Sequence, residues 1–208
     1  MSEINNLPAG ILEQVKKCAT VLRSGGIAAY PTDTVYGLGA DVYNESAVNK
    51  IYAAKQRPLN LPLPVLICDL PQLKELTADV PDSAQRLITA FWPGALTLVF
   101  NKATSFKSAA LAGDNKIAIR MPDHTITLRL IKEAACPIVG TSANLHGLPA
   151  VLTATDVGKQ MGTEVDFILE GGPCPGGTES TIVDVSGDKP IILRKGAITE
   201  KDILNLLD

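Results

Sequence analysis

The sequence predicts an α/β fold in which helices cover an open, mixed sheet. Apolar residues recur at helical spacing in several segments, and short apolar or β-branched runs lie between these segments. The last part of the chain is rich in predicted strands, which favours a mixed sheet over a wholly parallel one. The 208 residues are 46% apolar, enough to bury one large core. We therefore predict a single domain over residues 1–208, with its core at about 10–196 and a terminal helix at 199–207.

The first half of the chain alternates predicted helices and strands. Apolar positions from Ile11 to Leu22 mark one face of a helix that follows Pro8 and ends near Gly25. The predicted strands of this half are 27–30, 65–68 and 95–100, and the predicted helix caps are Asn44, Asp69 and Asp82.

The second half begins with an irregular, lysine-containing connection at 101–115. The predicted strands that follow are 116–121, 137–140, 166–169, 181–185 and 190–193, the last two forming a hairpin around Gly187. The predicted helix caps are Asp123, Thr153 or Thr155, and Thr199.

Composition excludes several classes of protein. A formal net charge of −3 and only 4% aromatic residues argue against a protein that coats nucleic acid along its length. The start of the chain has no basic and apolar leader pattern, and no apolar run is long enough to span a membrane, so we expect a cytoplasmic protein. The four cysteines are far apart and form no CxxC pair, so we expect reduced, core-filling thiols and no metal site: Cys18, Cys68, Cys136 and Cys174.

The stretch 31–41, PTDTVYGLGAD, does not have the apolar, core-like composition of the strand that precedes it. Thr32, Asp33 and Thr34 bring hydroxyls and a carboxylate to a strand end, where open α/β sheets bind ligands. An ordinary turn explains the stretch equally well. The KQRP segment, 55–58, ends a predicted helix with two cations that suit an anion, or that simply cap the helix.

Two further polar clusters follow strand ends. TSAN, residues 141–144, offers small hydroxyl and amide groups, although a Ser/Asn turn has the same composition. Ser180 follows Glu179 after the glycine-rich run 171–177, which is not a Walker loop and which we expect to be a flexible flap. Arg120 and Arg194 each close a predicted strand, and each could equally form a surface ion pair.

The usual catalytic sets are missing. His124 and His146 are the only histidines, and no GxSxG, HExxH or paired-cysteine motif occurs. Lys, Arg, Ser, Thr and Asn side chains suit the binding and orientation of anionic substrates. We therefore expect attack on a phosphoryl or acyl centre, driven by positioning and charge stabilisation.

Taken in order, these clusters resemble the YrdC family of threonylcarbamoyl-AMP synthases. The resemblance spans roughly residues 10–200, and the pairing of Lys-x-Arg with Ser-x-Asn is the distinguishing signature. The blocks are PTDTVYGLGAD at 31–41, KQRP at 55–58, TSAN at 141–144, ESTIVD at 179–184 and LRKGAI at 193–198.

The resemblance implies a twisted open sheet with a large concave cavity. It implies a nucleotidyltransferase that condenses L-threonine, bicarbonate and ATP to threonylcarbamoyl-AMP and diphosphate. That product serves the N6-threonylcarbamoylation of adenosine 37 in tRNA. The implied partners are Mg²⁺ bound with ATP, tRNA itself and the tRNA threonylcarbamoyl-transfer proteins that act downstream.

The resemblance also assigns roles to individual residues. Lys55 and Arg57 would act on the phosphates as the catalytic pair. The implied ATP-binding residues are Arg57, Lys116, Ser142, Asn144 and Arg194, and the implied threonine-binding residues are Thr34, Arg120, Gly140 and Ser180.

The chain departs from the family pattern at two positions. Leu61 stands where many relatives carry Lys or Asn, and Leu66 where some carry His, so only backbone contacts could survive there. Two alternatives remain open at this point. One is a module of the same fold that binds double-stranded RNA or tRNA, and the other is a carbamoyl-transfer or hydrolytic relative.

Overall fold

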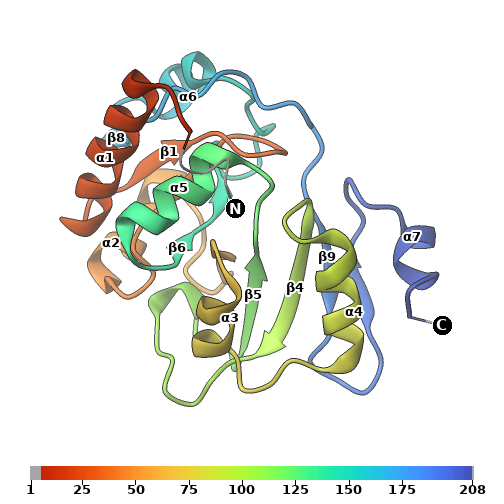
Figure 1. Ribbon diagram of the computed structural model, residues 1–208. Coiled ribbons are helices and arrows are strands. Elements are labelled where there is room, and N and C mark those ends of the chain that lie inside the picture. Colours follow the sequence, from red (N-terminus) through yellow and green to blue (C-terminus); the bar gives the residue numbers. More distant parts are fainter. Residues whose placement is uncertain (1–5, 208) are drawn as a thin grey trace.

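The computed structural model describes residues 6–207 and has the predicted α/β architecture (Figure 1). Residues 1–5 and 208 of the predicted domain lie outside the described part. The helices are α1 (Ala9–Arg23), α2 (Glu45–Lys55), α3 (Leu70–Leu76), α4 (Asp82–Phe91), α5 (Thr125–Ala134), α6 (Ala154–Met161) and α7 (Glu200–Leu204), with the short 3₁₀ helix η2 (Ala109–Leu111).

The strands form two mixed sheets rather than the one sheet that the sequence suggests. The larger sheet has the order β10-β9-β4-β5-β3-β6 and the smaller one β7-β2-β1-β8. The strands are β1 (Ala28–Tyr30), β2 (Gly37–Gly39), β3 (Val65–Leu66), β4 (Leu96–Asn101), β5 (Lys116–Arg120), β6 (Ile138–Val139), β7 (Thr141–Ser142), β8 (Phe167–Ile168), β9 (Thr181–Asp184) and β10 (Ile191–Arg194).

The register of the larger sheet brings distant segments side by side. β4 pairs in parallel with β9 and antiparallel with β5, so residues near 97, 119 and 182 become neighbours. Thr97 lies opposite Ile182, and Ile182 lies opposite Arg194 on β10. Since side chains alternate across a strand, every second residue of these strands points to the same face.

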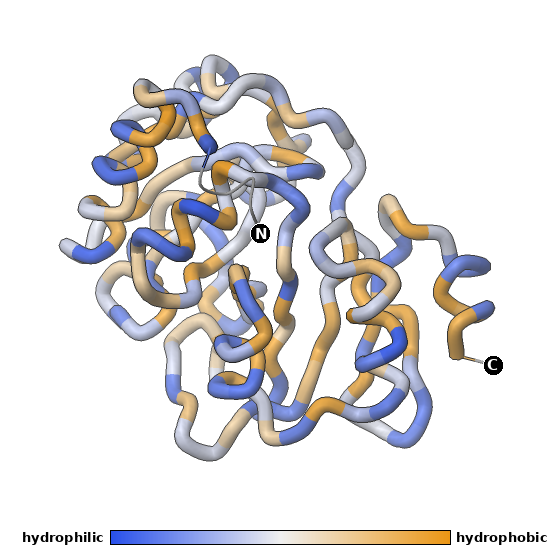
Figure 2. Tube along the Cα trace, in the orientation of Figure 1, coloured by the Kyte–Doolittle hydropathy of each residue, from blue (hydrophilic) through white to orange (hydrophobic). Residues whose placement is uncertain are grey.

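Two apolar clusters hold the sheets to their helices. One joins α1 and α5 over β1 and β3, and Val15, Leu22 and Leu130 in it have no exposed surface. The other is larger and packs α2, α3 and α4 against the strands. Figure 2 shows the corresponding pattern, in which the helices carry both hydrophobic and hydrophilic residues and β4 is mostly hydrophobic.

Most of the predicted helix caps are confirmed. Asn44, Asp69, Thr153 and Thr199 each accept a hydrogen bond from a backbone N–H in the first turn of a helix. The prediction for Asp123 is wrong by one residue, because His124 occupies the cap position and its side chain makes no cap bond. Asp82 is the first residue of α4 instead of its cap.

Gly37–Gly39 is a strand that the sequence did not suggest. The ring of Tyr30 on the paired strand fills the space where a Cβ would lie. A Cβ built at Gly37 would be 2.6 Å from that ring, and one built at Gly39 would be 2.7 Å from it. The two glycines therefore admit an aromatic ring into the core, and are not needed for chain flexibility. Thr141–Ser142 of TSAN extends this sheet by pairing with β2, so its start is a strand and not a turn.

The glycine-rich run 171–177 is tied down by hydrogen bonds. Gly177 donates its N–H to the carbonyl of Thr34 at 2.9 Å, and Cys174 donates to Leu152 at 2.8 Å. The Cys174 Sγ also accepts the N–H of Thr32 at 3.3 Å. This segment is a packed neighbour of the 31–36 loop, and the expectation of a free flap is not met.

The described part of the chain contains no helix long and apolar enough to cross a membrane. All four cysteines are free, and three of them are buried, in line with the predicted core-filling role.

Candidate functional site

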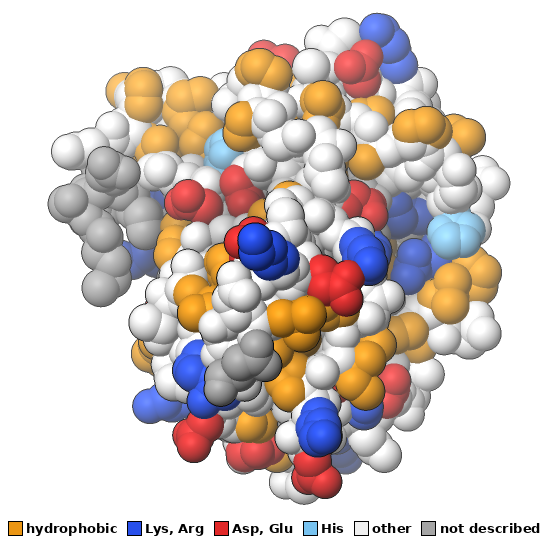
Figure 3. All heavy atoms as spheres, turned by 90° about the vertical axis from the view of Figure 1, so that its right-hand side faces the viewer, with side chains coloured by type: hydrophobic (Ala, Val, Ile, Leu, Met, Phe, Trp, Pro, Cys, Tyr) orange, Lys and Arg blue, Asp and Glu red, His pale blue; other side chains and the backbone are white. Residues whose placement is uncertain are grey.

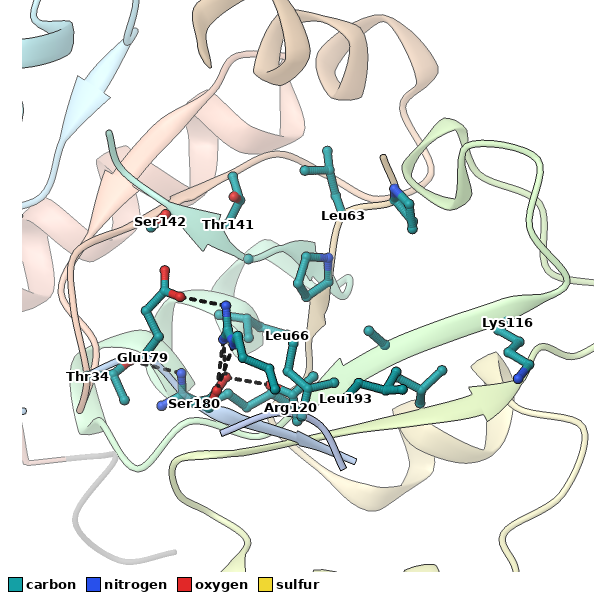
Figure 4. A pocket seen from close by; sticks show the side chains of 18 of the residues that line it. Thr34, Leu63, Leu66, Lys116, Arg120, Thr141, Ser142, Glu179, Ser180 and Leu193 are labelled. Carbon is teal, nitrogen blue, oxygen red and sulfur yellow. Dashed lines mark hydrogen bonds and ion pairs between the residues drawn. The ribbon is translucent and has the colours of Figure 1, made fainter. Parts of the chain in front are cut away.

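A cavity of about 410 Å³ lies over one face of the larger sheet (Figure 4). Alternate residues of β4, β5 and β9, together with Leu193 and Arg194 of β10, form its floor, and segments 62–66 and 140–142 form the opposite wall. Most of the predicted site residues line this cavity: Thr34, Arg57, Lys116, Arg120, Gly140, Ser142, Ser180 and Arg194. The large concave cavity implied by the family resemblance is therefore present.

Arg120 and Thr34 form one end of the cavity. Arg120 Nη1 donates to Thr34 Oγ1 at 2.9 Å, and its Nη2 forms an ion pair with Asp33 Oδ1 at 2.5 Å. Its Nε donates to the carbonyl of Gly94 at 2.9 Å. Burial lowers the pKa of the Arg120 guanidinium, and the charge of Asp33 opposes that shift. The guanidinium is thus fixed from three sides, and each terminal nitrogen retains one N–H for a ligand.

Ser180 lies at this end of the cavity and directly precedes β9. Its Oγ shares a hydrogen bond of 2.8 Å with Thr97 Oγ1, and both residues are buried. Arg194 Nη2 donates to the same Oγ at 3.2 Å and to the Ser180 carbonyl at 2.8 Å. The Thr97 and Ser180 hydroxyls therefore form a hydrogen-bonded pair that continues to Arg194.

Arg194 also forms an ion pair with Glu179, the residue that precedes Ser180. Its Nη1 lies 2.6 Å from Glu179 Oε2, and about two fifths of each side chain is exposed. In Figure 4 the Glu179 carboxylate stands between Ser180 on the floor and Ser142 on the opposite wall.

Lys116 marks the far end of the floor. Its Nζ pairs with Asp184 Oδ2 at 2.8 Å, while Ser186 donates twice to the other carboxylate oxygen. Burial alone would raise the pKa of Asp184, but these hydrogen bonds and the lysine charge outweigh burial and lower it. Three of the four cations that line the cavity therefore have a carboxylate partner.

Arg57 is the cavity-lining cation held only by neutral groups among the interactions of the described residues. Its Nη2 donates to the carbonyl of Pro62 at 3.1 Å, and its Nε to that of Leu61 at 3.4 Å. The Leu61 carbonyl also accepts the hydroxyl of Tyr52 at 3.0 Å. The backbone of Leu61 thus orients Arg57, a contact that does not depend on the Leu61 side chain.

Lys55 and Asn144 lie behind the cavity wall instead of lining it. Lys55 is 2% exposed, and its Nζ donates to the carbonyls of Ser142 and Asn144 at 2.5 and 2.6 Å. Burial and then the charge of Arg57 lower the pKa of Lys55 to about 8, against the opposing charge of Glu179. The structure therefore places Lys55 as a clamp on the TSAN segment.

Gly140 and Leu66 pack against each other in the cavity wall beside Arg120. A Cβ at position 140 would lie 2.3 Å from Leu66 Cγ, so glycine is required while Leu66 keeps its place. Leu66 is paired with Arg120 on the neighbouring strand, and it also lines the cavity. An apolar group therefore faces the cavity where some relatives of the family carry histidine.

Sequence reasoning missed several residues that shape the site. Thr97 lay inside an apolar strand pattern, and Asp33 and Glu179 gave no signal of their arginine partners, 87 and 15 residues away. The only available hint was that each carboxylate is adjacent to a hydroxyl residue at a strand end. Within residues 6–207 no group of three or more His, Cys, Asp or Glu side chains is placed to hold a metal ion.

Comparisons with known proteins agree with this geometry. A family model of Sua5, YciO and YrdC proteins, described as "Telomere recombination", matches residues 20–196. A Bacillus subtilis protein named threonylcarbamoyl-AMP synthase is 44% identical over 191 residues, which cover 91% of this chain and 55% of that protein. A Mycobacterium tuberculosis protein named putative threonylcarbamoyl-AMP synthase is 37% identical, covering 89% of this chain and 85% of that one.

A solved structure gives the same result. Pyrococcus abyssi Sua5 complexed with L-threonine superposes with a TM-score of 0.90 at 37% identity, covering 93% of this chain and 57% of that one. The chain thus spans about half the length of the first relatives it matches. The predicted family resemblance is confirmed, and the chain belongs to the Sua5, YciO and YrdC family.

Proposed function

We propose that this chain condenses L-threonine, bicarbonate and ATP to threonylcarbamoyl-AMP and diphosphate. The observation that carries the proposal is one cavity with two chemically different ends. Thr34, Arg120 and Ser180 form an end with hydroxyls and a fixed cation, while Arg57 and Arg194 border the rest. Relatives named threonylcarbamoyl-AMP synthase support the assignment. The reaction would make the chain a nucleotidyltransferase.

The amino-acid end suits a small hydroxylated substrate. The remaining N–H groups of Arg120 can receive a carboxylate, because Asp33 and Thr34 already hold the guanidinium in place. Ser180 and Thr34 offer hydroxyls, and the absence of a side chain at Gly140 lets the Leu66 side chain pack against the backbone there. We assign L-threonine to this end.

The nucleotide would lie along the cations. Arg57, Lys116 and Arg194 would neutralise phosphate charge, and Ser142 would contribute a hydroxyl from the opposite wall. Lys55 would act chiefly by holding the Ser142–Asn144 backbone, and Asn144 by completing that clamp. The carbamate oxygen formed from threonine and bicarbonate would attack the α-phosphorus and expel diphosphate.

Mg²⁺ would enter with the ATP phosphates, because the carboxylates that line the cavity already have cationic or N–H partners. Its chemistry would be to neutralise charge on the leaving diphosphate. Transfer of the product to tRNA would need separate proteins. Direct contact of this chain with tRNA and a cytoplasmic location remain predictions.

The RNA-binding alternative is less well supported. Lys and Arg side chains are interspersed with Asp and Glu on the face seen in Figure 3, without a broad basic patch. Carboxylates also partner most of the cavity cations. Backbone recognition of nucleic acid needs an excess of unpaired positive charge.

The test is to incubate the protein with ATP, bicarbonate and threonine and to measure diphosphate. We expect release that depends on threonine, and a product with the mass of threonylcarbamoyl-AMP. Serine and valine serve as matched controls for the hydroxyl and methyl groups. Diphosphate release independent of any amino acid, or none beside an active relative, would contradict the proposal.

A further inference from the structure

The reaction proposed above leaves one substrate group without a partner. Free threonine carries an ammonium group, and its nitrogen must lose a proton before it can attack a carbon atom. The amino-acid end contains Arg120 for the carboxylate and Ser180 and Thr34 for the hydroxyl. None of these can accept a proton from the ammonium while keeping its present hydrogen bonds. A carboxylate near this end would supply a proton acceptor, and this inference rests on the proposed function.

Three of the four carboxylates around the cavity are unsuited to this role. Asp33 is held by Arg120 at 2.5 Å, is largely buried and does not line the cavity. Asp184 accepts hydrogen bonds at both of its oxygens from Lys116 and Ser186. Asp114 accepts the N–H of Lys116, at the far end of β5 from Arg120. Four residues of strand separate those ends by roughly 13 Å.

Glu179 differs from these three in position and in bonding. It directly precedes Ser180, so its backbone is fixed beside the amino-acid end. Only Oε2 has a partner among the described residues, Arg194 Nη1 at 2.6 Å, and 44% of the side chain is exposed. In Figure 4 the carboxylate stands between Ser180 and the wall that carries Ser142.

We propose that Glu179 binds the ammonium group of the amino-acid substrate and removes its proton. The ammonium nitrogen gives one proton to the carboxylate and becomes a neutral amine. Its lone pair attacks the bicarbonate carbon, and a second N–H proton leaves with the bicarbonate hydroxyl as water. The carbamate oxygen then attacks the α-phosphorus, diphosphate departs, and Glu179 returns its proton to solvent.

The ion pair with Arg194 couples this step to the nucleotide. A phosphate that binds Arg194 competes with Glu179 for the guanidinium, and so releases the carboxylate toward the ammonium. The half-exposed pair can exchange partners at little cost, because water already solvates part of it. Nucleotide binding therefore prepares the base in the same cavity.

The test compares Glu179→Gln with Glu13→Gln, which removes a carboxylate from an exposed ion pair with Lys17 on α1. Glutamine keeps the size of Glu179 but cannot take a proton at neutral pH. Threonine and a non-hydrolysable ATP analogue are titrated by calorimetry, and threonine-dependent diphosphate release is measured. For Glu179→Gln we expect a dissociation constant for threonine raised at least tenfold and turnover lowered by roughly 10²-fold or more. Affinity for the analogue should be kept or increased, since Arg194 is released. Glu13→Gln should match the wild type.

Two results for the Glu179→Gln variant would overturn the inference. Unchanged threonine affinity and turnover in Glu179→Gln would remove Glu179 from the reaction. A loss of analogue affinity in parallel with turnover would show that Glu179 acts only by holding Arg194. A wild type that binds threonine but releases no diphosphate would contradict the proposed function, and the threonine titration of Glu179→Gln would still decide whether Glu179 receives the ammonium. A wild type that binds no threonine would overturn both.

Discussion

Two arginine–carboxylate pairs flank Ser180 and differ mainly in burial. The Arg120 and Asp33 side chains are 8% and 14% exposed, whereas those of Arg194 and Glu179 are 40% and 44% exposed. In the first pair, the arginine is also held by Thr34 and Gly94, so its direction is fixed before any ligand arrives. In the second, Ser180 also accepts hydrogen bonds from the arginine, and the glutamate side chain has no other hydrogen-bond partner among the described residues.

This difference suggests a division of labour within one cavity. A buried charge pair is expensive to break, because each partner left alone has lost its hydration. A half-exposed pair is worth little and can exchange its partners with ligands. We therefore expect Arg120 to act as a permanent part of the wall and Arg194 to act as a ligand-responsive cation.

The largest expected effect is on stability when the buried pair is broken. Asp33→Asn should lower the free energy of unfolding by about 3–5 kcal/mol, because it leaves the Arg120 charge buried and uncompensated. Glu179→Gln should lower it by less than about 1 kcal/mol. Urea unfolding of the two variants and the wild type provides the measurement. Equal losses in both variants would show that burial does not separate the pairs.

The next largest effect concerns the nucleotide. Arg194→Ala should weaken binding of a non-hydrolysable ATP analogue by about 1.5–3 kcal/mol, the range for a hydrogen bond to a charged group. Its stability should stay within about 1 kcal/mol of the wild type, since the arginine is half exposed. Calorimetric titration and urea unfolding test the two statements separately. Unchanged analogue affinity would remove Arg194 from the nucleotide site.

The fold class and several of the polar residues that line the cavity could be predicted from local patterns. Asn44 and Thr153 were recognisable as caps because their bonding partners lie three residues away. Polar residues at strand ends gave Thr34 and Ser180 in the same way. The role of Gly37 could not be predicted, because its neighbour in space, the Tyr30 ring, decides it.

The ion pairs could not be predicted from the sequence for the same reason. Asp33 and Arg120 are 87 residues apart, and only the packing of two sheets brings them together. Lys55 was expected at the phosphates because a lysine beside an arginine suits an anion. Its burial against carbonyls of TSAN depends on the position of a strand that begins at Thr141.

A smaller effect should come from the hydroxyl pair of Thr97 and Ser180, which is hydrogen-bonded to Arg194. Thr97→Val removes the 2.8 Å partner of Ser180 Oγ while keeping the shape of the side chain. We expect a loss of about 1 kcal/mol in stability and a similar loss in threonine binding, because the serine hydroxyl is buried and loses its orientation. Thr89→Val, which removes an exposed hydroxyl on α4, is the matched control. Equal changes in the two variants would assign no special role to Thr97.

The smallest expected effect is the coupling energy between Arg194 and Glu179. Its dependence on salt tests the comparison of the two ion pairs most directly. A double-mutant cycle of Arg194→Ala with Glu179→Ala should give a coupling energy of about 0.5 kcal/mol at low ionic strength, since both side chains are partly hydrated. In 1 M NaCl, where charges are screened within roughly 3 Å, that coupling should nearly vanish. The corresponding cycle for Arg120 and Asp33 should keep most of its coupling, because counter-ions cannot reach the buried pair. If salt weakened the two couplings by the same fraction, Arg194 would be as fixed as Arg120, and exchange of its partner on nucleotide binding would lose its physical basis.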